Sequence, residues 1–382
     1  DVPVILGSAT PTLESLHHCD EDRYEHLELP QRAGAAQPPV LQLVDLARTP
    51  SPDGLSESLA GAIAAAIEAG NQALIYLNRR GYAPTLICTE CGHVVDCERC
   101  DSRMTVHASD ASLRCHHCGA RRALPGSCGE CGAAVKRLGE GTQRIEESLR
   151  TRFPAARIRR IDSDTLQHKG AMESALSEAV EGAADILVGT QMLSKGHHFP
   201  LLTLVGVVNA DQGLFGTDFR ASERLAQSIV QVAGRAGRVA ERGRVIIQTA
   251  FAAHPFWQAL LDGGYRRIAA TAMAEREQSR WPPFTWLALV RAAAPQGATA
   301  LDFLAVARRH LEAGHDEYLR VLGPVDAPME RRAGMHRAQL LLQSSSRRSL
   351  HSALAQLRPA LEADPASRRV RWSIDVDPIE LF

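Results

Sequence analysis

Four CxxC pairs constrain this chain more than any other feature: eight of its nine cysteines fall between residues 88 and 131. A CxxC turn directs two thiolates to one point, and two such turns complete a tetrahedral set of four sulfurs around Zn²⁺. Eight sulfurs therefore predict two zinc ions. Two alternatives stay open, namely four redox-active dithiols and iron in place of zinc in one site.

The spacing between the pairs predicts how they combine. Only five residues, 92–96, separate the first pair from the second, which is too short to carry a strand out and back. Fourteen residues, 101–114, separate the second pair from the third, which is enough for a hairpin. We therefore favour a nested arrangement over the sequential and interleaved ones. The inner metal is then held by Cys97, Cys100, Cys115 and Cys118, and the outer metal by Cys88, Cys91, Cys128 and Cys131.

Around the cysteine-rich segment, apolar stretches alternate with helical ones. Strands are predicted at 72–81, 156–162, 184–190, 202–211 and 243–250, and helices at 141–153, 169–180 and 222–237. This alternation is typical of a parallel sheet with helices on both faces. The C-terminal residues are predicted to form a small α/β domain, with strands at 285–293, 336–344 and 370–376 and helices at 300–312 and 347–361.

Three motifs occur in order along the chain. GSATPTLES (7–15) follows an expected strand at 2–6, GTQMLSKGHHFP (189–200) follows another strand, and QVAGRAGR (231–238) ends a helix. The ordered set resembles motifs III, V and VI of superfamily 2 helicases. That resemblance implies an α/β RecA-like helicase lobe. The predicted two-zinc ribbon, with four cysteines per metal, interrupts this lobe, and the small C-terminal α/β domain follows it.

The helicase resemblance also implies nucleotide contacts. Such enzymes bind ATP between two lobes, and an arginine stabilises the negative charge that builds on the transferred phosphoryl group. Arg238 is similar to the arginine that reaches the γ-phosphate, with Arg235 beside it and Gln231 as a polar contact. Gly189 and Thr190 are placed to meet phosphate oxygens. The alternative for the two arginines is a solvated, salt-bridged helix end.

The resemblance also implies contacts with DNA for the loop in GTQMLSKGHHFP (189–200) and for GSATPTLES (7–15). Gln191 and Lys195 lie in the loop that, in helicases of this kind, contacts the DNA backbone and links that contact to the nucleotide state. Ser8 and Thr10 resemble the residues that couple hydrolysis to movement along the strand. The alternative for these two hydroxyls is capping of the helix that begins after them.

A more specific resemblance covers the whole chain. The segments LNRRGYAP (77–84), GEGTQRIEESL (139–149), LFGTDFRASER (214–224) and RRVRWSIDVDPIELF (368–382) are similar to the PriA family of bacterial replication restart helicases. The family implies a cytoplasmic, ATP-dependent 3′-to-5′ DNA helicase that acts in replication fork restart and primosome assembly. Its implied partners are branched or forked DNA, single-stranded DNA, primosome proteins and the single-stranded-DNA-binding protein.

Some expected features are absent from the sequence. Asn209 stands where the family usually has a carboxylate, which leaves Asp211. The chain has no GxxxxGK[ST] loop and no DEAH-like acidic box, and it begins at Asp1. We therefore expect a fragment that is inactive alone and that uses ATP and Mg²⁺ in the full-length enzyme. A non-catalytic zinc-ribbon scaffold that binds DNA or protein is the alternative.

These observations predict four regions. Residues 1–40 are expected to be the end of a first helicase lobe and a linker, 41–85 with 138–278 the second lobe, 86–137 the zinc-binding insertion, and 279–382 the C-terminal domain. The formal net charge is −1, so binding of nucleic acid must depend on local basic patches. No stretch approaches 18 uninterrupted apolar residues, so no membrane partner is expected.

Overall fold

The computed structural model describes residues 2–29, 37–49, 51, 53–77, 85–88, 90–91, 93, 95–98, 104–107, 112–114, 120–138, 142–161, 171–190, 199–208, 210–214, 218–237, 242–314 and 317–381. The chain divides into two compact units. Unit 1 comprises residues 1–82 and 140–275, and unit 2 comprises residues 83–139 and 276–382. No described helix combines the length and the apolar character that a membrane crossing requires.

Unit 1 is built on a parallel sheet with the strand order β1-β11-β10-β2-β9-β8. The strands are β1 (Val40–Asp45), β2 (Gln72–Leu77), β8 (Ile158–Ile161), β9 (Ile186–Gly189), β10 (Leu202–Val208) and β11 (Arg244–Thr249). All six residues of β2 are buried, as expected for an inner strand that is covered on both faces. Five of these strands were predicted, and β1 was not.

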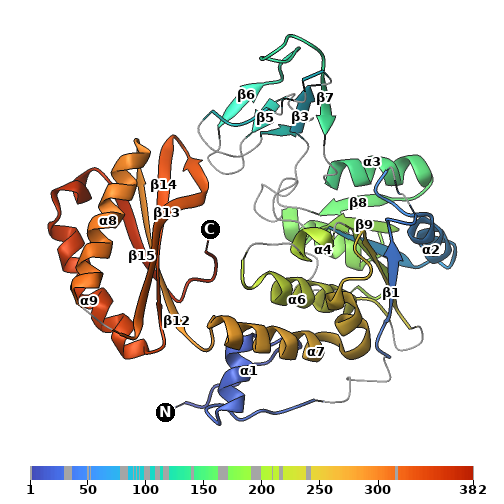
Figure 1. Ribbon diagram of the computed structural model, residues 1–382. Coiled ribbons are helices and arrows are strands. Elements are labelled where there is room, and N and C mark those ends of the chain that lie inside the picture. The colour runs from blue at the N-terminus through green and yellow to red at the C-terminus, as the bar shows by residue number, and fades with distance from the viewer. Residues whose placement is uncertain are drawn as a thin grey trace. The chain divides into compact units, whose positions relative to one another are not determined.

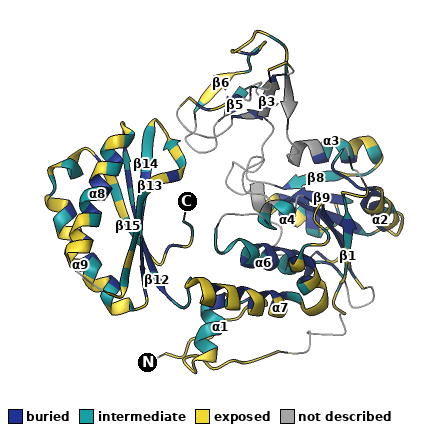
Figure 2. Ribbon diagram, viewed as in Figure 1, coloured by how far each residue is buried: buried dark blue, intermediate teal, exposed yellow. Residues whose placement is uncertain are grey.

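Helices cover both faces of this sheet, as the sequence predicted (Figures 1 and 2). They are α1 (Leu13–Asp20), α2 (Glu57–Glu68), α3 (Thr142–Arg152), α4 (Ala171–Val180), α5 (Asp211–Leu214), α6 (Ala221–Ala233) and α7 (Pro255–Ser279). One apolar core joins the sheet to α1, α4, α6 and α7. A second core joins the opposite face to α2 and α3. The predicted α/β lobe is therefore confirmed.

The predicted strand at 2–6 is wrong. These residues have no regular secondary structure, and Val2, Val4, Ile5 and Leu6 are 85%, 79%, 87% and 69% exposed. A strand needs a neighbour to pair its backbone groups. No strand in the described part of the chain pairs with this segment. Its apolar sequence thus has strand character without a sheet partner.

The cysteine-rich segment is held together by two small antiparallel sheets. β3 (Thr85–Cys88) pairs with β7 (Val135–Leu138) and joins the two ends of the segment. β4 (Thr105–His107), β5 (Ser112–Arg114) and β6 (Arg121–Ala123) form the second sheet. The β4–β5 pairing is the hairpin that the fourteen-residue spacing predicted.

The C-terminal domain is an antiparallel sheet with the order β13-β14-β12-β15. Its strands are β12 (Trp286–Ala294), β13 (Leu319–Arg332), β14 (Met335–Ser344) and β15 (Arg371–Val376). The helices α8 (Gly297–Ala313) and α9 (Arg347–Ala363) pack into one apolar core with this sheet. The predicted α/β domain is confirmed, although β13 was not predicted.

Candidate functional sites

The structure brings together the outer four cysteines. Cys88 ends β3, and Cys128 lies shortly before its partner strand β7, so the β3–β7 pairing places the first and last CxxC turns side by side. The Cys88 and Cys131 sulfurs are 3.4 Å apart, and those of Cys91 and Cys128 are 3.7 Å apart. All four sulfurs lie within 4.8 Å of one another.

This geometry fits zinc. Zn–S bonds of about 2.3 Å in a tetrahedron place the sulfurs about 3.8 Å apart. The Cys88 sulfur accepts hydrogen bonds from the backbone N–H groups of Cys91 and Glu90, at 3.5 and 3.4 Å. Those bonds lower the pKa of the Cys88 thiol to about 6. A backbone hydrogen bond with His93 lowers the pKa of Cys91, but the neighbouring Cys131 and Cys88 sulfurs outweigh it and raise that pKa to about 12, so the fit to Zn²⁺ rests on the sulfur positions. The predicted outer set of ligands is thus confirmed as a group that suits Zn²⁺.

The inner set is described only in part. Cys97 is buried in a small apolar cluster with Leu86, Val95, Met104 and Leu113. Its predicted co-ligands Cys100, Cys115 and Cys118 lie outside the described residues. The second zinc ion therefore stays a prediction, supported by the β4–β5 hairpin that lies between Cys100 and Cys115 in the sequence.

The candidate phosphate-binding residues lie at the carboxyl end of β9, an inner strand next to the edge strand β8. Gly189 is the last residue of β9 and pairs with Tyr76 of β2 on one side and with Ile161 of β8 on the other. Thr190 follows directly and is half-buried. Carboxyl ends of parallel strands meet at one edge of the sheet, which is where α/β proteins bind ligands. Gln191 and Lys195 lie outside the described residues.

The motif at 231–238 lies at the end of α6. Gln231 is in the last turn, the helix ends at Ala233, and Arg235 follows in a turn. Partial burial lowers the pKa of Arg235. Arg238 lies outside the described residues.

The first motif contacts this helix. Thr10 is only 4% exposed, and its hydroxyl accepts a hydrogen bond from Gln231 Nε2 at 3.2 Å. Ser8 Oγ accepts a bond from the Thr10 backbone N–H at 3.0 Å. The alternative that Ser8 or Thr10 caps the helix is wrong, because the N-cap of α1 is Thr12, whose side chain accepts from Ser15 N. The structure therefore joins two motifs that are 221 residues apart.

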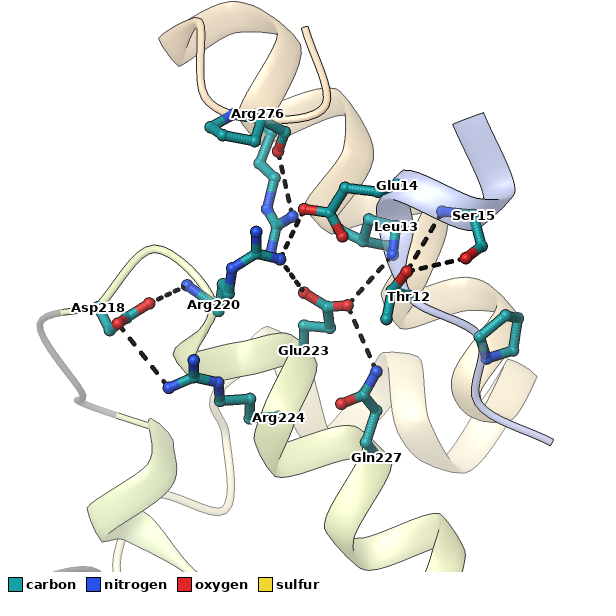
Figure 3. Close-up of polar contacts among 12 residues, drawn as sticks. Thr12, Leu13, Glu14, Ser15, Asp218, Arg220, Glu223, Arg224, Gln227 and Arg276 are labelled. Carbon is teal, nitrogen blue, oxygen red and sulfur yellow. Dashed lines mark hydrogen bonds and ion pairs between the residues drawn. The ribbon is translucent and has the colours of Figure 1, made fainter. Parts of the chain in front are cut away.

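Sequence reasoning missed three residues that complete this contact. Both Glu223 and Gln227 lie on α6. Glu223 accepts from the Leu13 N–H (Figure 3), and Gln227 Nε2 donates to the Thr10 carbonyl. Tyr265 of α7 donates a hydrogen bond to the Pro11 carbonyl at 2.5 Å. The four-residue spacing of Glu223, Gln227 and Gln231 was the available signal, because residues at i and i+4 share one helix face.

The single carboxylate near the expected acidic pair has structural partners. Asp211 begins α5, and its side chain accepts hydrogen bonds from the Thr249 hydroxyl and from the Ala250 N–H, the latter at 2.9 Å. Asn209 lies outside the described residues. The Asp211 contacts link the end of β10 to the end of β11.

Residues 277–379 match the family model of the primosomal protein N C-terminal domain, and residues 97–122 match that of the PriA DNA helicase Cys-rich region. The replication restart protein PriA of Haemophilus influenzae is 43% identical over 382 residues, which is 100% of this chain and 52% of that protein. The Bacillus subtilis protein of the same name is 38% identical over 380 residues, which is 98% of this chain and 47% of that protein. The chain is similar to PriA proteins over its whole length. It spans about half the length of these PriA relatives.

The match to the PriA Cys-rich region bears on the nested arrangement. It begins at Cys97 and ends at Arg122, so it includes all four predicted inner ligands and none of the outer four. The structure groups the outer four independently. The two observations divide the eight cysteines in the same way.

Proposed function

We propose that this chain is the C-terminal part of an ATP-dependent DNA helicase that acts in replication restart. The observation that carries this proposal is the similarity to PriA proteins over the whole chain. It extends across the parallel-sheet lobe, the cysteine-rich segment and the C-terminal domain, and is not confined to one module. In the full-length protein, this lobe contributes one wall of a nucleotide site, and Mg²⁺ binds with ATP.

The nucleotide-facing residues of this lobe act by charge and position. Arg238, with Arg235 beside it, stabilises the charge that develops on the γ-phosphoryl group, as an arginine supplied from the facing lobe does in such motors. Gln231 supports the same edge through its bond with Thr10. Gly189 and Thr190 lie at the end of β9, where backbone N–H groups and a hydroxyl are suited to phosphate oxygens.

Contacts with nucleic acid belong to the loop after β9 and to the first motif. Gln191 and Lys195 hold the DNA backbone, and Ser8 and Thr10 couple its movement to hydrolysis. Forked and single-stranded DNA are the substrates, with 3′-to-5′ movement, in the bacterial cytoplasm. The zinc-binding segment is a rigid projection that suits strand separation or contact with primosome proteins, because metal sites order small modules that lack a large core.

The decisive experiment compares ATP hydrolysis by full-length variants. Arg238→Ala is expected to lower the DNA-stimulated turnover by about 10³-fold or more, the effect of losing an arginine finger. The matched control is Arg150→Ala, which removes an exposed arginine of the same lobe that pairs with Glu146 at 2.6 Å. A turnover close to that of the wild type for Arg238→Ala contradicts the role of this side chain.

The same preparation separates the motor from the scaffold. A motor unwinds a duplex that carries a 3′ single-stranded tail and leaves one with a 5′ tail intact. A full-length wild-type protein that binds both DNAs and hydrolyses no ATP supports the non-catalytic zinc-ribbon scaffold instead.

A further inference from the structure

One face of α6 carries three polar side chains that contact the same short segment. We call Glu223, Gln227 and Gln231 the α6 polar row, and residues 10–13 the motif-linked segment. Glu223 Oε1 accepts from the Leu13 N–H at 3.1 Å, and Gln227 Nε2 donates to the Thr10 carbonyl at 3.3 Å. With the bond from Gln231 to the Thr10 hydroxyl, three successive turns of α6 are joined to the two ends of the segment.

Glu223 has the most constrained environment of the row. The residue is 3% exposed, and a buried carboxylate is costly unless polar partners surround it. Its partners include the Leu13 N–H, the Gln227 amide at 3.3 Å and the Arg220 guanidinium at 3.9 Å (Figure 3). Arg220 also pairs with Glu14 of α1 at 2.6 Å. Both the carboxylate and its counter-charge therefore contact the first turn of α1.

The Leu13 N–H is a group that needs such a partner. Leu13 is the first residue of α1, and the first N–H groups of a helix have no partner within the helix. The positive end of the helix dipole further favours a negative charge at this position. Thr12 already accepts from Ser15 N, so the Glu223 carboxylate supplies an acceptor that the segment itself does not provide for Leu13.

The contact fixes the segment relative to the end of α6. Gln231, which holds the Thr10 hydroxyl, lies in the last turn of α6, and Arg235 follows the end of this helix in a turn. A rigid helix transmits the position of one end to the other. Movement at the arginine end of α6 therefore displaces Thr10 as long as Glu223 keeps the start of α1 on the helix.

We propose that Glu223 is a positioning residue that holds the motif-linked segment on α6, so that Thr10 and Gln231 move together during the nucleotide cycle. This inference rests on the proposed function, because its consequence is the coupling of ATP hydrolysis to DNA movement. Glu223 touches neither nucleotide nor DNA in this role and acts through Leu13 and Gln227.

The first test is hydrogen exchange in the full-length protein. Glu223→Ala removes the acceptor, and the amides of residues 10–16 are expected to exchange about tenfold faster, the scale of one lost hydrogen bond to a charged group. Glu223→Gln keeps an oxygen that accepts from Leu13 and is expected to remain close to the wild type. The control Glu178→Ala removes an exposed glutamate of α4 that pairs with Arg159 at 3.1 Å. Unchanged exchange in Glu223→Ala overturns the proposal.

The second test measures base pairs unwound per ATP hydrolysed. We expect Glu223→Ala to lower this ratio about tenfold while the ATP turnover stays within about threefold, because an uncoupling defect is separate from a catalytic one. Glu223→Gln should recover most of the base pairs unwound per ATP. General destabilisation of the lobe does not explain such a recovery. A wild-type ratio in Glu223→Ala overturns the role. A wild-type protein without any ATP turnover instead contradicts the proposed function, and the exchange test still decides whether Glu223 holds the segment.

A double variant gives an independent check. Thr10→Val removes the hydroxyl that accepts from Gln231 while keeping a similar side-chain volume. If Glu223 acts by keeping Thr10 on Gln231, Glu223→Ala should lower the coupling ratio much less in the Thr10→Val background than in the wild type. Fully additive losses contradict a shared role.

Discussion

The nested arrangement of the cysteines predicts which pairs of substitutions remove one zinc ion and which remove two. Cys88→Ser with Cys131→Ser destroys only the outer site and should leave one ion. Cys88→Ser with Cys97→Ser destroys one ligand of each site and should leave none. The sequential arrangement predicts the reverse, because Cys88 and Cys97 would then share one metal and Cys131 would belong to the other. Cys19→Ser, which changes the ninth cysteine outside the segment, is the matched control and should retain two ions.

The structural consequence of losing the outer ion can be estimated. The β3–β7 ladder joins four residue pairs, and each of its backbone hydrogen bonds contributes only about 0.5–1.5 kcal/mol net. A structural zinc site contributes about 10–16 kcal/mol in small modules at neutral pH. The metal therefore contributes more to the stability of this segment than the β3–β7 hydrogen bonds do. Its removal should open the β3–β7 pairing, while unit 1 keeps its own apolar cores.

The assay combines native mass spectrometry with hydrogen exchange. Mass spectrometry counts the metal ions in each double variant, and exchange at residues 135–138 reports the ladder. The reasoning is refuted if the Cys88→Ser, Cys97→Ser variant retains one zinc, or if the wild type binds only one. It is also refuted if the outer-site variant loses its ion without faster exchange in β7.

Two further predictions concern stability. Phe303 is 1% exposed in the core of the C-terminal domain, so Phe303→Ala should lower the stability of that domain by about 3–5 kcal/mol, which calorimetry should record while the melting of unit 1 is unchanged. Asp185 accepts hydrogen bonds from Arg157, which lowers the pKa of its carboxyl. The folded state thus favours the ionised carboxyl. Its contribution to the free energy of unfolding is small because solvent screens the pair. This contribution is present above the usual Asp pKa of about 3.9 and is lost as the pH falls through the lowered pKa. Chemical unfolding should therefore show Asp185→Asn least stable relative to the wild type near neutral pH, with the difference vanishing once the pH is below the lowered pKa; a constant difference contradicts the assignment.

The predictable part of the fold follows from local patterns. β2 was visible because a continuous apolar run suits an inner strand that is buried on both faces. β13 was hidden because it contains Gly323, Pro324 and Pro328, which are unfavourable within a sheet. The structure explains their tolerance: β13 is an edge strand and has irregular register with β14 between Leu322 and Val325.

α7 was missed for a similar reason. It contains Gly264 in a non-helical conformation with φ of 59°, which interrupts the 3.6-residue pattern of a long helix. The apolar run at 2–6 led to the opposite error. Its composition predicts a strand, but composition does not supply the neighbouring strand that a sheet requires.

The two candidate sites differ in how far the sequence determines them. The outer site joins cysteines that their CxxC spacing and ligand chemistry identify as metal ligands, and the gap lengths favoured the nested pairing over the sequential and interleaved ones. The α6 polar row joins positions 210 to 221 residues apart. In the sequence, the four-residue spacing of Glu223, Gln227 and Gln231 places them on one helix face, but the solvated face of an amphipathic helix has the same spacing.

Burial changes the energetic cost of replacing these side chains. A solvated glutamate tolerates replacement by alanine with little cost, whereas loss of Glu223, which is 3% exposed, deprives the Leu13 N–H and the Arg220 guanidinium of a shared carboxylate. The metal site lies in unit 2 and the α6 polar row in unit 1, each with its own apolar core. Removal of zinc should therefore leave the exchange of residues 10–16 unchanged, and Glu223→Ala should leave the zinc content unchanged. If either perturbation affects the other site, the two sites are energetically coupled, and neither the metal nor the polar row acts as a local element.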